Sequence, residues 1–540
     1  MAASEVIHAL TRPVRRLVVP GWLTVAALAS LALPVWLPVA VMLYEAQRAD
    51  VSSLVRDGRL GLLLGRSLAV AGGTAGLAVL LGLPLALALA RLRLPGASWL
   101  KMGLVLPLLV PPYISAIGWL HLLGRSGALN GWLTDLLGLG GPPIDLYTVG
   151  GTVWVLGLSL FPVVALPALA ALDSIDPDLE EAARLAGGRW AGLWYITLPL
   201  IAPAVLAGAL LVFLLALTEF TVPSFLSVQV YTVEVFTRFG AFYDFGAGTA
   251  MAVPLLALAL VAFAGQRLLA EQRASSPFEA PAASRRLPAA GWWAWPVAAW
   301  CLALPLLAWA VPLYALAGRA PTPDDFALAW EAAQTEIINS LLFAAAGAGL
   351  GLLAGWPVAW VVVRARTGLG RSLTEALALL PLAVPSIVLG IGLIRLWNRG
   401  GLFQWVYGSP AIILLGYVAR SLPFVVVVLV AAWRQIPPVF EEAAEVDGAS
   451  RRQSARWVIL PLLWPGLAAA WSLAFVVAVT ELPTTLLVYP PGQATLPVRI
   501  FTMQHDGRVE HVAALCLILV AITLLPAGVA WIWSQRREAV

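Results

Sequence analysis

Long apolar segments recur along this chain of 540 residues and restrict what it can fold into. Residues 253–264 and 425–432 are two uninterrupted apolar runs within longer segments. A helix that crosses a bilayer needs about 20 mainly apolar residues. Charged residues make up 11% of the chain, whereas a soluble protein carries about 25%. These features predict an all-α integral membrane protein.

We expect about twelve transmembrane helices. Their approximate positions are 18–43, 62–90, 100–123, 148–170, 198–217, 247–269, 292–316, 338–363, 374–397, 410–432, 460–480 and 511–533. Arginine and lysine are disfavoured in translocated loops, and most of the 33 basic residues fall in inside loops if both termini are cytoplasmic. That orientation is therefore predicted. The run from residue 17 to 43 is long for a signal peptide, so we expect it to remain as the first span.

The chain contains an internal repeat. Four short matches occur in the same order in both halves: 84–91 with 357–364, 106–111 with 380–385, 180–183 with 441–444, and Thr218-Glu219 with Thr480-Glu481. Each half has six spans, an even number, so both enter the membrane the same way round. Their pseudo-twofold axis should then run along the membrane normal, with a transport pathway at the interface. We place the halves at 1–270 and 291–540, joined by a cytoplasmic linker at 271–290 rich in Pro, Ser, Ala and Arg.

A short cytoplasmic loop after the fourth span of each half has the features of a helix followed by a turn. In the first copy Asp176 is a favourable N-cap, and the carboxylates of Glu180 and Glu181 suit the positive end of a helix. Gly187 is a natural stop for this helix, as Gly448 is in the second copy. Alanines form the apolar face, where another protein's backbone could approach closely. The loop is therefore predicted to be a docking surface, although one copy alone could simply connect two spans.

The pattern Glu-Ala-Ala, three residues, Gly and then Ile-x-Leu-Pro resembles the motif of permeases in binding-protein-dependent ABC importers. The resemblance implies that loops 171–197 and 433–459 are coupling loops, each seated in a cleft of a cytoplasmic ATPase subunit. The coupling residues would be Glu180, Glu181, Ala182, Ala183, Gly187, Glu441, Glu442, Ala443, Ala444 and Gly448. It also implies a bacterial inner membrane, two copies of the ATPase and one periplasmic binding protein. Such a chain is not an enzyme and binds no cofactor, because ATP and Mg belong to the ATPase; no Gly-rich phosphate loop ending in Gly-Lys-Ser/Thr occurs in the sequence.

Two fused halves are similar to the ferric-iron branch of this family. The stretch Thr-Glu-Leu-Pro-Thr-Thr-Leu-Leu at 480–487 supports this most, and ferric iron is the expected substrate. Thiamine, a polyamine, a phosphonate or another small solute remains an alternative. Four residues are candidates for the pathway: Thr218, Glu219, Thr480 and Glu481. The two carboxylates could attract a cation, or each could cap a helix end.

An ion-coupled secondary transporter would also have six plus six spans. Such a protein tends to keep ionisable groups at mid-membrane, where they are costly and therefore functional, and we expect almost none in these spans. Cys301 and Cys516 both lie in apolar stretches, so neither a disulfide nor a metal site is expected. Nucleic-acid binding would need a clustered basic face, and the sequence has none.

Overall fold

A computed structural model describes residues 21–47, 58–274, 291–364, 369–437 and 439–538. Within these ranges every regular element is a helix. Ten helices are long and apolar enough to cross a membrane, and two bent helix pairs bring the number to twelve. The prediction of an all-α protein with about twelve spans is confirmed. Most of the predicted linker 271–290 lies outside the described residues.

The first half begins with a span made of three consecutive helical segments and ends with α15. Its elements are α2 (Gly21–Leu31), η1 (Ala32–Trp36), α3 (Leu37–Ala46), α5 (Arg59–Arg91), α6 (Ala97–Gly103), α7 (Leu106–Leu109), α8 (Pro112–Leu123), α9 (Ala128–Leu137), α10 (Val149–Asp173), α11 (Pro177–Gly192), η2 (Leu193–Thr197), α12 (Leu198–Thr218), α13 (Thr221–Phe225), α14 (Tyr231–Phe236), η3 (Thr237–Ala241) and α15 (Phe245–Ala274).

The second half repeats this order. Its elements are η4 (Gly291–Trp293), α16 (Ala294–Ala317), α17 (Pro323–Arg364), α18 (Leu369–Leu379), η5 (Leu380–Ala383), α19 (Ser386–Trp397), α20 (Leu402–Tyr407), α21 (Ala411–Arg434), α22 (Val439–Val446), α23 (Arg451–Ser454), η6 (Ala455–Ile459), α24 (Leu460–Val479), α25 (Pro483–Val488), α26 (Leu496–Asp506) and α27 (Val509–Glu538).

The third span of each half differs from the prediction of one continuous helix at 100–123 and at 374–397. The chain bends by 91° between α7 and α8 and by 102° between η5 and α19. Val110 and Val384 stand at the two breaks with extended ψ angles of 117° and 114°. Each precedes a proline, whose ring disfavours the helical conformation of the residue before it. The matching Leu-Pro-Leu-x-Val-Pro segments therefore mark a break that both halves share.

Three central helices pack against one another in each half, α5 with α10 and α12, and α17 with α21 and α24. Glycines allow the closest of these approaches. A Cβ atom on Gly347, Gly351 or Gly355 of α17 would lie 2.6–2.9 Å from the side chains of Tyr417, Ser421 and Val425 of α21. In a membrane, helices associate through such small-residue stripes because lipid gives no hydrophobic driving force between them.

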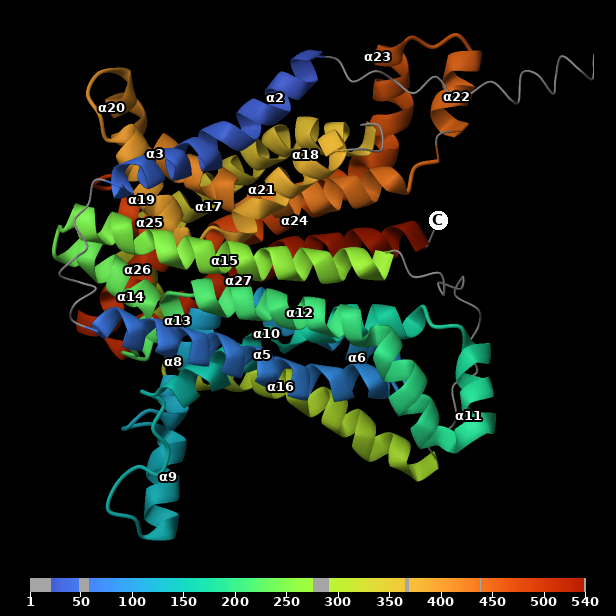
Figure 1. Ribbon diagram of the computed structural model, residues 1–540. Coiled ribbons are helices and arrows are strands. Elements are labelled where there is room, and N and C mark those ends of the chain that lie inside the picture. Colours follow the sequence, from blue (N-terminus) through green and yellow to red (C-terminus); the bar gives the residue numbers. More distant parts are fainter. Residues whose placement is uncertain (1–20, 48–57, 275–290, 365–368, 438, 539–540) are drawn as a thin grey trace, which may run out of the picture.

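The first span of each half packs on the other half. The segments α2 and α3 contact α17 and α19, while α16 contacts α8. Figure 1 shows this exchange, with α2 among the helices of the second half and α16 below α5. The two halves are thus interleaved, and their separation would expose the faces that each first span covers.

The repeats point the same way along the bundle. In Figure 1 the long helices run across the view, with α11, α22 and α23 beyond one end of the bundle and α9 and α20 at the other. Both predicted coupling loops therefore lie at the same end. A pseudo-twofold axis along the membrane normal produces this arrangement.

Candidate coupling site and transport pathway

The first predicted coupling loop contains the helix α11, which begins at Pro177, directly after the predicted N-cap Asp176. The Asp178 amide donates a hydrogen bond of 2.9 Å to the Asp176 carboxylate, so Asp176 satisfies a free N–H group at the helix start. In the second loop α22 covers Val439–Val446. The short helix predicted for each loop is present.

The two coupling helices expose equivalent faces. Glu181 and Ala182 of α11 are exposed and Ala183 is half-buried; Glu442, Ala443 and Ala444 of α22 follow the same pattern. Beside them, Leu185 and Val446 are 85% and 86% exposed. A matched pair of exposed apolar side chains at the same end of two repeats agrees with the predicted docking surface.

The turn in the first loop lies one residue later than predicted. Gly188, not Gly187, has the left-handed backbone, with φ 80° and ψ 178°. Gly187 continues the helix, and a Cβ there would lie 2.7 Å from the Ala191 Cβ. In the second loop Gly448 takes the turn as predicted, with φ 81°. A side chain is strained at such φ values, so glycine is required at 188 and 448.

Each coupling helix is tied to the second span of its own half by an arginine–glutamate pair. The Arg91 guanidinium, at the last residue of α5, lies 2.7 Å from Glu180. Glu180 also accepts a hydrogen bond of 3.1 Å from the Thr197 hydroxyl. In the second half Arg364, the last residue of α17, pairs with Glu441 in the same way. Glu180 and Glu441 therefore face the membrane helices, whereas Glu181 and Glu442 face outward.

The predicted pathway residues lie at the opposite end of α12 and α24 and act as helix caps. Glu219 accepts hydrogen bonds from the Thr221 hydroxyl and amide, the latter at 2.8 Å. Glu481 accepts one of 3.0 Å from the Thr484 amide. The hydroxyls of Thr218 and Thr480 each donate to a carbonyl one turn back in their helices, at 3.0 and 2.8 Å.

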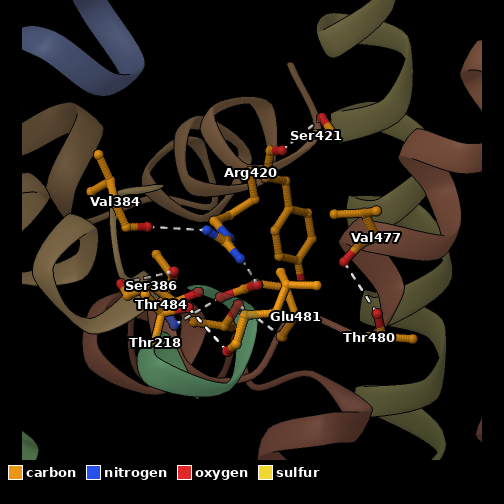
Figure 2. A network of polar contacts seen from close by, with 12 residues as sticks. Thr218, Val384, Ser386, Arg420, Ser421, Val477, Thr480, Glu481 and Thr484 are labelled. Carbon is orange, nitrogen blue, oxygen red and sulfur yellow. Dashed lines mark hydrogen bonds and ion pairs between the residues drawn. The ribbon is translucent and has the colours of Figure 1, made fainter. Parts of the chain in front are cut away.

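Glu219 and Glu481 belong to different halves of the chain. Figure 2 draws Thr218 of the first half, the residue before Glu219, in the same group of side chains as Glu481 of the second half. The matched residues therefore lie near the interface of the halves. Whether they line the pathway stays a prediction.

Glu481 also has a partner that the sequence interpretation missed. Arg420, in the middle of α21, lies 3.5 Å from the Glu481 carboxylate and donates a hydrogen bond of 3.2 Å to the Val384 carbonyl at the break of the third span. Figure 2 shows the guanidinium between these two groups. The expectation of almost no ionisable groups in the spans was wrong here. A lone arginine inside an apolar segment is the signal that could have found it. Ser159 occupies the matching position of α10, so this charge is present in one half alone.

A family model described as "Binding-protein-dependent transport system inner membrane component" matches residues 78–274 and 347–537. Each match contains one coupling helix and one capping glutamate. The chain belongs to this family. It is a multi-pass inner-membrane permease of a binding-protein-dependent ABC importer, and the ion-coupled alternative is set aside.

Relatives match this permease over different lengths. The "Fe(3+)-transport system permease protein FbpB 2" of Haemophilus influenzae is 24% identical over 94% of this chain and 97% of its own length. The "Ferric transport system permease protein FbpB" of Actinobacillus pleuropneumoniae is 24% identical over 89% of this chain and 74% of its own. A protein named as a 2-aminoethylphosphonate transport system permease, from Salmonella typhimurium, is 36% identical over 27% of this chain and 54% of its own length.

Proposed function

We propose that this permease imports ferric iron, received from a periplasmic binding protein and driven by two copies of a cytoplasmic ATPase subunit. Both termini would face the cytoplasm, where α11 and α22 would each meet one ATPase copy. The observation that carries the substrate proposal is the match to the first of the ferric permeases, which covers nearly the full length of both chains. This match includes both halves of the permease, which are fused in one chain in the relative as well.

The mechanism we propose is alternating access. Closure of the ATPase dimer on ATP would bring α11 and α22 together. The Arg91–Glu180 pair would transmit this motion to α5, and the Arg364–Glu441 pair would transmit it to α17. Because α5 and α17 are central helices of their halves, their displacement would open the interface between the halves at the far end, where Glu219 and Glu481 lie.

A cation would be favoured at this far end if the pathway passes Glu219. Arg420 compensates the charge of Glu481, whereas the first half has Ser159 at the position that matches Arg420 in the repeat. Glu219 would therefore supply most of the attraction for a cation. Opposite charges interact more strongly in a partly dehydrated site than in water.

A phosphonate importer is the second candidate, because the phosphonate permease relative has the higher identity, although over 146 residues. The two substrates can be separated by reconstituting the permease with its ATPase and the binding protein encoded beside it. Uptake of radioactive ferric iron, with no uptake of 2-aminoethylphosphonate, is the expected result. Phosphonate uptake without iron uptake would replace the substrate and leave the importer assignment intact.

A further inference from the structure

A pocket of about 450 Å³ lies beside the first coupling helix and has no assigned role. Leu87 and Ala88 of α5, with Leu92 directly after that helix, form an apolar wall, and Arg184 and Trp190 of α11 form part of the opposite side. Arg91 and Glu180 also line it, but they pair with each other. The pocket therefore combines an apolar wall with a net positive charge from Arg184.

The second half replaces the key residue of this pocket by a large one. Trp360 of α17 stands at the position of Leu87, four residues before the last arginine of its helix. Its ring lies 5.0 Å from the Trp433 ring and 5.6 Å from the Arg364 guanidinium carbon. An indole thus occupies the space beside the arginine where the first half has a leucine.

The charges differ as well. Glu445 takes the place of Arg184, and Ile459 takes the place of Thr197, the hydroxyl partner of Glu180. Both repeats have the arginine–glutamate pair, so coupling alone does not explain why the first half has leucine at 87 and arginine at 184, where the second half has tryptophan and glutamate.

The surroundings of the pocket are those of a membrane–water interface. Trp190, Trp194 and Tyr195 are 76%, 63% and 79% exposed, and tryptophan and tyrosine gather at the headgroup level of bilayers. The pocket also adjoins the end of α5, a helix long enough to cross the membrane. A ligand here would have access from the lipid.

We propose that this pocket binds one anionic phospholipid from the leaflet on the side of the coupling helices. Acyl carbons would lie along Leu87, Ala88 and Leu92, and the phosphate would lie against Arg184. Basic pockets at helix ends on this side of a membrane suit anionic headgroups. The lipid would bridge α5 and α11 and so support the coupling helix of the first half alone. In the orientation proposed above, the leaflet is the cytoplasmic one; binding itself does not depend on that orientation.

The test uses the full chain purified in mild detergent and titrated with dioleoyl phosphatidylglycerol, with bound lipid counted by native mass spectrometry. The wild type should bind one phosphatidylglycerol tightly and phosphatidylcholine more weakly. Leu87→Trp should lose this binding, because it copies the filled second half. Arg184→Gln should weaken it about fivefold, the contribution expected of one basic residue near anionic lipid.

Leu80→Trp is the matched control, because Leu80 lies two turns earlier on α5 and is 68% exposed. It should bind phosphatidylglycerol like the wild type. Arg184 is exposed, so Arg184→Gln tests the site even if Leu87→Trp folds poorly. Equal binding of phosphatidylcholine, unchanged binding in both pocket variants, or saturation of the site by glycerol phosphate alone would each overturn the proposal.

Discussion

Gly118 of α8 and Pro312 of α16 pack so closely that a Cβ atom on the glycine would lie 2.5 Å from the proline carbonyl oxygen. The same contact recurs between Gly392 of α19 and Pro38 of α3, with a corresponding distance of 2.8 Å. In both cases the first span of one half meets the broken third span of the other. These two contacts join the halves at points that the pseudo-twofold axis relates to each other.

Gly118→Ala combined with Gly392→Ala should therefore destabilise the packing of the halves. The added methyl groups meet backbone atoms, which cannot move aside as a flexible side chain can, and overpacking costs about 1–3 kcal/mol at each site. Thermal unfolding of the purified permease would measure this. Gly349→Ala of α17 is the control, because a Cβ there meets nothing within 4 Å. A melting temperature equal to that of the control would show that the contact is not needed.

Reversing the Arg91–Glu180 pair tests whether it transmits motion. Arg91→Glu or Glu180→Arg alone places like charges together in a buried site, where loss of one partner costs about 3–5 kcal/mol. Each should reduce the ATP hydrolysis that the binding protein stimulates in proteoliposomes. The double reversal should restore much of it. Lys101→Asp is the control, because its pair with Asp173 is exposed at 41% and 51% and should contribute little.

The turns at Gly188 and Gly448 should be necessary for docking of the ATPase. Alanine at both sites strains the backbone by about 1–3 kcal/mol per site and should displace the segment after each coupling helix. Copurification of the ATPase subunit should fall, while the amount of permease in the membrane persists. Gly76→Ala with Gly349→Ala gives the same number of methyl groups at open helical positions. If the ATPase copurifies normally with the variant that has alanine at both turns, these glycines are not needed for docking.

The predicted orientation can be tested by cysteine labelling, since the native Cys301 and Cys516 are both buried. Ser450 lies between α22 and α23 at the coupling end, and Ser409 lies between α20 and α21 at the other. A cysteine at 450 should react with a membrane-impermeant reagent only in inside-out vesicles. One at 409 should react only in intact cells. The reverse pattern would place both termini outside.

The number and order of the spans were predictable because a long apolar run is recognised without any tertiary contact. The bends at Val110 and Val384 were not predicted, although the following prolines supply a local reason, because a bend leaves the apolar composition of a segment unchanged. Matching of the two repeats predicted that the first coupling helix ends at Gly187. Of the adjacent glycines 187 and 188, it is Gly188 that has the positive φ angle of the turn. Such a choice depends on how the next segment packs, and sequence spacing does not encode it.

The pairing of Arg420 with Glu481 could not be predicted from the sequence either, because it depends on how helices pack. The two residues lie on different elements, and only the packing of α21 against α24 and α25 brings them together. The carboxylate at 481 looked equivalent to that at 219 because both follow a threonine at the same place in the repeat. Their environments differ because α21 carries Arg420 beside Glu481, whereas the first half has Ser159 at the matching position. The internal repeat alone therefore overstated how similar the two glutamates are.

Glu481 should stabilise the fold through its ion pair with Arg420, whereas Glu219 should not. Glu481→Gln keeps an oxygen for the Thr484 amide but leaves the largely buried Arg420 without its ionic partner, which should cost about 3–5 kcal/mol. Glu219→Gln keeps its capping oxygen and should unfold at nearly the wild-type temperature. Adding Arg420→Met to Glu481→Gln removes the uncompensated charge and should recover most of the lost melting temperature. If Glu481→Gln alone is as stable as Glu219→Gln, the ion pair contributes nothing to stability, and Arg420 would have to be explained by a role during transport.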